Sequence, residues 1–289
     1  MNGISRLGSL KCQTDSQVKS LETTVMICKA VEQQDTEKRL FHVVLQDTVI
    51  FPTGGGQPCD LGSINGMPVV EAFRKDGTCV HVVEGEVREG QRVIVEVDWE
   101  RRFDHMQQHS CQHLLSAVML RDLNVDTFGW ALNPFDKPSF FELVGVANDD
   151  AILQSVERTV NAIIREGIDV TVRTVEQTEA SGIVADEFGD ARFVSIGQID
   201  DNACCGTHVS NTKDIQVVKI VGTEKVRKTN LRVMFVAGNR LVNAFHASLL
   251  RDRQLNVLLC CGPELYVQRV EQMRASIKQL TKEAKKSKK

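Results

Sequence analysis

The chain has 289 residues, of which 42% are hydrophobic and 25% are charged, and its formal net charge at pH 7 is -3. Such a composition is that of an ordinary globular protein, and this length predicts about two domains. The net charge argues against broad nucleic-acid affinity, because nonspecific binding depends on neutralising phosphates. No run approaches the roughly 18 apolar residues of a membrane span, and the polar start lacks a secretory signal's apolar core. We therefore expect a cytoplasmic protein without membrane contact.

The cysteine content points to a reducing environment. Nine cysteines are an odd number, and they are irregularly spaced in a chain too long for a small disulfide-stapled fold. Reduced thiols together with a metal site fit this pattern better than a disulfide framework does.

Residues 1–20 are polar and are expected to be flexible, whereas residues 21–100 carry the signals of β structure. Two Asn-Gly or Asp-Gly pairs, at residues 65–66 and 76–77, lie between apolar runs and fit tight hairpin turns. The region is predicted to be a small antiparallel sheet or barrel. Its strand candidates, rich in β-branched residues, are Thr23–Cys28, Phe41–Leu45 and Arg92–Val97.

The pattern becomes helical after Trp99. Apolar residues recur at helical spacing from residue 103 to about 122, and again from an N-cap at residue 149 or 150 to a C′ glycine, Gly167. Strands are expected at Ile168–Val175 and Ile215–Val221. Helices followed by separate strands predict an α+β unit over residues 101–250.

The last segment, residues 251–289, is predicted to be an amphipathic helix followed by a lysine-rich tail. Its apolar side chains follow a 4-3-4-3 spacing, which places them along one narrow seam. These residues are Tyr266, Val270, Met273, Ile277 and Leu280.

Two pairs of metal-binding side chains lie far apart in the sequence. His109 and His113 are four residues apart and so share one face of the predicted helix. Cys204 and His208 are also four apart, and Gly206 between them gives the backbone freedom to fold both ligands inward. Imidazole and thiolate are ligands that zinc prefers, so the two pairs predict one zinc site formed by tertiary folding.

Two neighbours compete for a place in this site. Cys205 stands beside Cys204, and His105 extends the histidine row by one helical turn. A metalloprotease of the His-Glu-x-x-His type is excluded, because Ser110 occupies the position of the glutamate that acts as general base there. No general base is identified.

A third motif is the glycine-rich run within residues 48–58. Gly54, Gly55 and Gly56 are consecutive, and their lack of side chains lets main-chain N–H groups approach a ligand closely. Such a geometry suits an oxyanion or a sugar-phosphate backbone.

In this order, the three motifs resemble the freestanding alanyl-tRNA editing proteins of the AlaX family, which are relatives of the editing domain of alanyl-tRNA synthetase. The motifs are Thr-x-x-Phe-Pro-x-Gly-Gly-Gly-Gln, then His-x-x-x-His, then Cys-x-x-x-His containing Gly-Thr-His. The resemblance also includes residues 97–106 and 223–225, so it covers roughly residues 22–245. One departure is Cys205, which stands where many relatives have glycine.

The resemblance implies an α+β protein with three parts. Residues 21–100 would form an N-terminal antiparallel β-barrel, residues 101–250 the editing domain, and residues 251–289 a C-terminal helix and basic tail. It implies that zinc is bound by His109, His113, Cys204 and His208. It also implies that the aminoacyl group is bound by Thr48, Gly54, Gly55, Gly56 and Gln57.

The implied activity is zinc-assisted hydrolysis of a mischarged tRNA, with seryl-tRNA the favoured substrate and Thr48 pairing its hydroxyl with the serine side chain. The alternative from another class is a noncatalytic tRNA- or RNA-binding module with structural zinc, because four protein ligands saturate a tetrahedral ion. A zinc hydrolase of an unrelated ester is the third reading. Phosphate contacts are expected from a basic run, namely Lys225, Arg227, Lys228 and Arg232.

Overall fold

A computed structural model of the chain has two compact units, Met1–Arg240 (unit 1) and Leu241–Lys289 (unit 2). The sequence predicts a boundary ten residues later, at residue 250. The structure describes residues 3–31, 39–135, 137–146, 148–176, 190–227 and 230–287.

The N-terminal strands of unit 1 close into an antiparallel barrel with the order β1-β2-β5-β4-β3-β6, which confirms the predicted barrel. Its strands are β1 (Ser20–Ala30), β2 (Phe41–Leu45), β3 (Gly62–Ile64), β4 (Met67–Lys75), β5 (Thr78–Val83) and β6 (Arg92–Val97). Buried and exposed residues alternate strictly along β6, as a strand with one face on a core requires. Both predicted turns have positive φ at each central residue, as hairpin turns of this kind need.

The segment before the barrel is packed rather than loose. Leu7, Leu10 and Cys12 are at most 8% exposed and belong to the barrel's hydrophobic core. A short helix, α1 (Lys11–Thr14), follows the first two of them. This packing differs from the flexible N-terminus that the polar composition predicts, because a few apolar residues are enough to anchor the segment.

The helix α2 (Trp99–Leu123) begins at an N-cap, Asp98, whose side chain accepts a hydrogen bond from the N–H of Arg101. One turn later the fully buried Arg102 forms an ion pair with Asp60 of the barrel, with a distance of 2.9 Å from Nε to Oδ2. Arg102 also donates to the carbonyl of Ser16. A single guanidinium thus joins the barrel, the N-terminal segment and the central helix.

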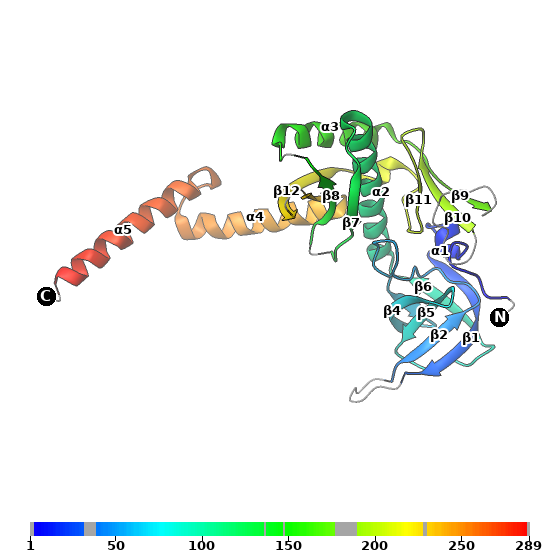
Figure 1. The fold of residues 1–289 in the computed structure, drawn as a ribbon. Coiled ribbons are helices and arrows are strands. Elements are labelled where there is room, and N and C mark those ends of the chain that lie inside the picture. The colour runs from blue at the N-terminus through cyan, green and yellow to red at the C-terminus, as the bar shows by residue number, and fades with distance from the viewer. Residues whose placement is uncertain are drawn as a thin grey trace. The chain divides into compact units, whose positions relative to one another are not determined.

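Two sheets and a second helix pack around α2 in the rest of unit 1 (Figure 1). The four-stranded sheet has the order β12-β13-β8-β7, and the three-stranded sheet has the order β11-β10-β9. The elements are β7 (Thr127–Ala131), β8 (Ser139–Val144), α3 (Asp150–Glu166), β9 (Val170–Glu176), β10 (Asp190–Ile196), β11 (Asp200–Ala203), η1 (Thr212–Ile215), β12 (Val218–Arg227) and β13 (Asn230–Ala237). The predicted α+β class is therefore confirmed.

The helix α3 lies where the sequence predicts it, between its N-cap Asp149 and the left-handed Gly167. The strand predicted at residues 215–221 begins only at Val218. Residues 212–215 instead form the 3-10 turn η1, which Asn211 caps by accepting a hydrogen bond from the N–H of Lys213.

Unit 2 contains α4 (Asn239–Leu259) from Leu241 onward, together with η2 (Pro263–Leu265) and α5 (Tyr266–Lys286). Tyr266 joins the two helices, because its hydroxyl donates to the Asp252 carbonyl at 2.6 Å. The predicted C-terminal helix is thus present. Within the described part of the chain, no helix combines the length and apolarity needed to cross a membrane.

The Arg102–Asp60 pair generates the first prediction. Asp60→Asn leaves the Arg102 charge buried without its carboxylate, and we expect the free energy of unfolding to fall by about 3–5 kcal/mol. Urea unfolding followed by circular dichroism measures the loss. Glu86→Gln removes an exposed carboxylate of the same unit and should change stability by less than about 0.5 kcal/mol. Equal unfolding midpoints for the two variants would contradict the role assigned to the pair.

Candidate metal centre

The four side chains predicted to bind zinc converge in the structure. The ligand atoms of His109, His113, Cys204 and His208 all lie within 4.8 Å of one another. The Cys204 Sγ is 3.4 Å from His109 Nε2 and 3.3 Å from His208 Nε2. The three histidines are almost completely buried. The two distant pairs therefore meet, and the group can hold a metal ion.

Gly206 is required here for close approach. A Cβ atom at this position would overlap the His109 ring and would lie 2.7 Å from Gln57 Oε1. The sequence suggests backbone freedom as the reason for this glycine, but the structure gives a steric reason. The loop from Cys204 to His208 comes close enough to α2 only because residue 206 has no side chain.

Gln57 fixes the orientation of the first histidine. Its Oε1 accepts a hydrogen bond from the N–H of Thr207 at 3.0 Å, and its Nε2 donates to the Thr207 hydroxyl at 2.9 Å. The same Oε1 lies 2.8 Å from His109 Nδ1, so that nitrogen must donate its proton. The Nε2 of His109 is left without a proton and faces Cys204, as a metal ligand must.

The other two histidines are held in the same way. His113 Nδ1 donates to Asp200 Oδ2 at 2.7 Å, and His208 Nδ1 lies 3.1 Å from the Ser110 hydroxyl. Metal-binding histidines almost always use their second nitrogen for a contact of this kind, which sets the tautomer and the ring orientation. The four clustered side chains and the residues that hydrogen-bond to them therefore both fit a metal site.

The charges of the cluster also suit a cation. Burial by itself would raise the pKa of the Cys204 thiol, but His109 and His208 lower that pKa well below its ordinary value. Burial lowers the pKa of His109 and of His208. Burial opposes protonation of His113 too, yet the hydrogen bond to Asp200 raises its pKa to about 9. A thiolate beside the neutral imidazoles of His109 and His208 is a donor set that binds divalent zinc, and His113 joins it by releasing its proton when the metal binds.

The glycine loop lies against this cluster. Gly55 and Gly56 are exposed and have φ angles of 55° and 76°, which only glycine adopts readily. A Cβ at Gly55 would lie 2.6 Å from Cys205 Sγ, and one at Gly56 would lie 2.8 Å from the Trp130 ring. Within the described ranges, neither N–H group has a hydrogen-bond acceptor.

The structure distinguishes the two neighbouring cysteines. Cys204 belongs to the cluster, whereas the Sγ of Cys205 accepts a hydrogen bond from Arg74 Nη2 at 3.0 Å. Two further donors hold the backbone of this pair, because Arg192 Nη1 reaches the Cys204 carbonyl and Gln13 Nε2 reaches that of Cys205. Cys205 is therefore turned toward the barrel and does not take the place of Cys204.

His105, which the sequence leaves open as a competing ligand, and Asp104 beside it on α2 have other contacts. His105 is outside the cluster and lies buried with its Nδ1 4.0 Å from Asp60 Oδ1. Asp104 forms a buried ion pair with Arg240, with 2.7 Å between Nε and Oδ1.

Thr48 lies inside the barrel and is 1% exposed. His81 Nδ1 donates to the Val43 carbonyl, and burial lowers the His81 pKa to about 4, so His81 is neutral and its Nε2 is an acceptor. The Thr48 hydroxyl therefore donates to His81 Nε2 at 2.9 Å and accepts from the N–H of Ile50 at 3.0 Å.

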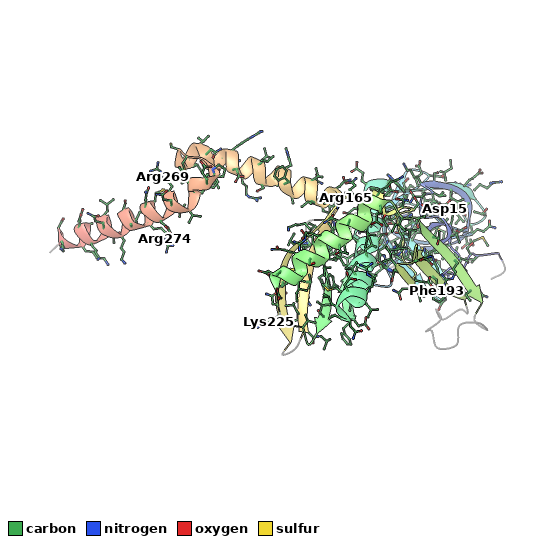
Figure 2. The ribbon with its side chains drawn as sticks, turned by 90° about the horizontal axis from the view of Figure 1, so that it is seen from above. Asp15, Arg165, Phe193, Lys225, Arg269 and Arg274 are labelled. Atoms are coloured by element: carbon green, nitrogen blue, oxygen red, sulfur yellow. The ribbon has the colours of Figure 1, made fainter. Side chains whose placement is uncertain are left out.

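The predicted basic run lies on the β12–β13 hairpin. Figure 2 shows Lys225 far from Asp15, the residue that follows α1. Lys225 is exposed, but the Arg232 guanidinium is 2.8 Å from Glu142 and stacks 4.2 Å above the Phe140 ring. The Lys228 position and the Arg227 side chain lie outside the described residues.

Sequence reasoning misses three residues that contact the ligands. Asp200 and Ser110 support histidines, and the Trp130 ring centroid is 4.6 Å from that of His109. Ser110 stands next to His109 in the sequence, and Asp200 precedes Cys204 by four residues. For Trp130 the sequence gives no comparable signal, because only the pairing of β7 with β8 brings it to α2.

Comparison with known proteins assigns a class to this fold and site. Residues 191–234 match the threonyl and alanyl tRNA synthetase second additional domain. The chain is 40% identical over 285 residues to the alanyl-tRNA editing protein Aarsd1 of Mus musculus, covering 94% of this chain and 69% of that protein. It is 33% identical over 229 residues to the alanyl-tRNA editing protein AlaX-L of Pyrococcus horikoshii, covering 75% of this chain and 56% of that protein.

A third relative is the putative alanyl-tRNA editing protein alaX of Saccharomyces cerevisiae, which is 30% identical over 317 residues. The chain therefore belongs to the alanyl-tRNA editing protein family. It spans 64–69% of the length of its relatives from Mus musculus and Bos taurus.

The Asp200–His113 contact generates the second prediction. Asp200→Asn keeps the size of the side chain but removes the charge that holds His113 Nδ1–H, and we expect zinc affinity to fall by about 10- to 100-fold. Competition with a fluorescent zinc chelator measures the affinity. Asp201→Asn is the matched control, because the adjacent Asp201 is half-exposed and pairs with Arg173. Equal zinc affinity in both variants would show that Asp200 does not support the metal site.

Proposed function

We propose that this protein is a trans-editing hydrolase that removes a wrongly attached small amino acid, serine above all, from tRNA. The observation that carries the proposal is the four-residue cluster with the glycine loop against it, in a chain of the alanyl-tRNA editing family. Synthetases that bind small side chains discriminate weakly against an added hydroxyl, so a separate hydrolytic site is needed for accuracy. We propose a cytoplasmic location for this activity, because the cytoplasm is a compartment where tRNA is charged.

The metal of this proposal is zinc, held by His109, His113, Cys204 and His208. Zinc bound there would supply positive charge beside the ester carbonyl of the aminoacyl group, and Lewis acidity toward it if one of the four side chains gave up its place. The role of the protein is to fix the orientation of the side chains that bind the metal. Gln57, Asp200 and Ser110 bond to the Nδ1 atoms of the histidines, so that the Nε2 atoms stay directed at one point.

The glycine loop would act on the same carbonyl. During hydrolysis negative charge develops on the carbonyl oxygen, and preorganised N–H donors stabilise it, by about 3–4 kcal/mol for one donor. The N–H groups of Gly55 and Gly56 suit this role, since both residues are exposed and both groups lack an acceptor in the described parts of the chain. Their contact with Cys205 and Trp130 keeps the loop beside the cluster.

The rest of the tRNA would bind elsewhere on unit 1. Lys225 is exposed at the end of a hairpin and suits a phosphate, whereas Arg232 is already paired with Glu142. We therefore propose that Lys225 contacts a phosphate of the tRNA, together with Arg227 and Lys228 of the same basic run. Arg232 would contribute less to the affinity for tRNA.

A deacylation panel tests the proposal. The purified chain is incubated with alanine tRNA and threonine tRNA, each charged with serine, glycine or alanine, and release of the amino acid is measured. We expect fastest release of serine, and Cys204→Ala should abolish it, because one of the four metal ligands is lost.

Cys205→Ala is the matched control, since its thiol points to Arg74 and not into the cluster. We expect it to keep most of the activity and the bound zinc. Circular dichroism of each variant reports whether the fold is intact. If wild-type protein binds seryl-tRNA tightly but releases no serine, the hydrolase is rejected and the alternative, a tRNA-binding module with structural zinc, takes its place.

We also propose that Thr48 selects serine by accepting a hydrogen bond from its hydroxyl. The Thr48 oxygen uses one acceptor position for Ile50, so one remains for a substrate whose side chain reaches into the barrel, where Thr48 is 1% exposed. Thr48→Val should reduce the preference for serine over alanine. It should also lower the free energy of unfolding by about 1–3 kcal/mol, because His81 Nε2 and the Ile50 N–H lose their buried partner.

The control is Thr48→Ser, which keeps the hydroxyl and should keep the preference. If Thr48→Val lowers stability but leaves the serine preference unchanged, Thr48 supports the barrel alone and does not contact the substrate.

A further inference from the structure

The residues that contact the cluster differ in their access to solvent. Gln57, Ser110 and Thr207 are fully or almost fully buried. Among the residues that the structure describes around the cluster, solvent reaches Cys204, Cys205, Gly55, Gly56 and Trp130. A substrate that approaches the metal from solvent would therefore meet this face, where Trp130 offers the largest side chain.

Trp130 is held in place from two sides. Its ring centroid is 4.6 Å from that of His109, with 46° between the ring planes. On the other side, the edge of its six-membered ring lies 2.8 Å from where a Cβ of Gly56 would be. The N–H of Leu132 donates to the Gly56 carbonyl at 3.1 Å, which ties the end of β7 to the glycine loop. The indole thus has little freedom to move away from either neighbour.

We propose that Trp130 is a specificity-determining residue whose indole ring forms a wall against the side chain of the bound aminoacyl group and sets an upper limit on its size. This inference rests on the proposed function. If the ester carbonyl lies between the metal ligands and the N–H groups of Gly55 and Gly56, the amino-acid side chain must fit beside the ring that contacts both His109 and Gly56. We expect a methyl or hydroxymethyl group to fit in this position and a branched side chain to collide with the indole.

The size of the expected change in selectivity follows from the steric limits of small apolar sites. One added methylene group changes selectivity by about 10- to 200-fold where a pocket wall is rigid. Truncating the wall should therefore admit larger substrates while it removes contacts that hold small ones. Trp130→Ala is expected to change the ratio of rates between substrates, and not to lower all rates equally.

The experiment compares one tRNA charged with serine or with valine. For wild-type protein we expect kcat/KM to favour seryl-tRNA strongly. In Trp130→Ala the ratio of valine to serine in kcat/KM should rise about tenfold or more. Trp130→Phe, which retains an aromatic wall, should lie between the two. Phe128→Ala is the matched control, because Phe128 is an aromatic residue of the same strand that is 74% exposed, and it should leave the ratio unchanged.

A binding measurement keeps the proposal testable if Trp130→Ala folds poorly. Trp99 and Trp130 are the two tryptophans of the chain, so in Trp99→Phe the fluorescence reports Trp130 alone. A non-hydrolysable adenosine carrying serine through a 3′-amide should shift or quench this emission. Adenosine without the serine should leave the emission near its starting value, because the wall contacts the amino-acid part.

The outcomes distinguish a failure of the Trp130 wall from a failure of the proposed hydrolase activity. If wild-type protein hydrolyses seryl-tRNA but Trp130→Ala slows both substrates equally, the wall is rejected and the proposed function stands. Equal fluorescence changes with adenosine and with its serine derivative would likewise overturn the wall, since Trp130 would then contact the nucleoside. A wild-type protein that hydrolyses neither substrate rejects the proposed function, and the role of Trp130 with it.

Discussion

The geometry of the metal centre depends on hydrogen bonds to the far side of each histidine ring. A neutral imidazole can present a lone pair on either nitrogen, and the wrong tautomer would direct a proton at the metal. Gln57 and Asp200 accept hydrogen bonds from the Nδ1 atoms of His109 and His113 and so determine which nitrogen stays free. Gln57 itself has no rotational choice, because Thr207 satisfies both ends of its amide. The centre is therefore set by residues that do not touch the ion.

Because these hydrogen bonds come from different parts of the chain, the metal centre needs both the barrel and the α+β part of unit 1. Gln57 comes from the loop after the barrel's second strand, His109 and His113 from α2, and Asp200 from the start of β11. Arg102 and Asp60 anchor α2 to the barrel close to its first turn, so the histidines farther along the helix meet the glycine loop in a fixed position. The family relationship extends over both parts, as the comparison with the Mus musculus protein shows.

Much of this arrangement can be predicted from the sequence. The elements that cannot be predicted are hidden for physical reasons. The strand β6 and the helix α3 are visible because burial imposes a period of two or of about 3.6 residues on them. The helix α2 is visible from the spacing of its apolar residues, although it is buried without a break from Asp104 to Leu115. By contrast, β11 consists of Asp-Asp-Asn-Ala and is a strand only through its pairing with β10. The helix α4 goes unpredicted although Leu241, Phe245 and Leu249 recur at helical spacing, and among its described side chains only Arg240 is buried.

The same distinction applies to the site. The four side chains of the cluster are recognisable because a spacing of four residues places the members of each pair together locally. Gln57 is expected to contact the substrate, but it is 1% exposed and bonds to His109 and Thr207, a role that only the tertiary fold assigns. Asp200 and Trp130 likewise gain their positions from strand pairing.

The wide separation of these parts along the chain has a consequence for biosynthesis. Gln13 contacts the carbonyl of Cys205, and 192 positions separate the two residues. Domains generally fold from the N-terminus as the ribosome extends the chain, so the barrel can form while the segment with Cys204 and His208 is still unmade. Until that segment emerges, the nascent protein holds two imidazoles and no thiolate at the centre. A metal that uses all four side chains can therefore be bound only after the segment with Cys204 and His208 has been made.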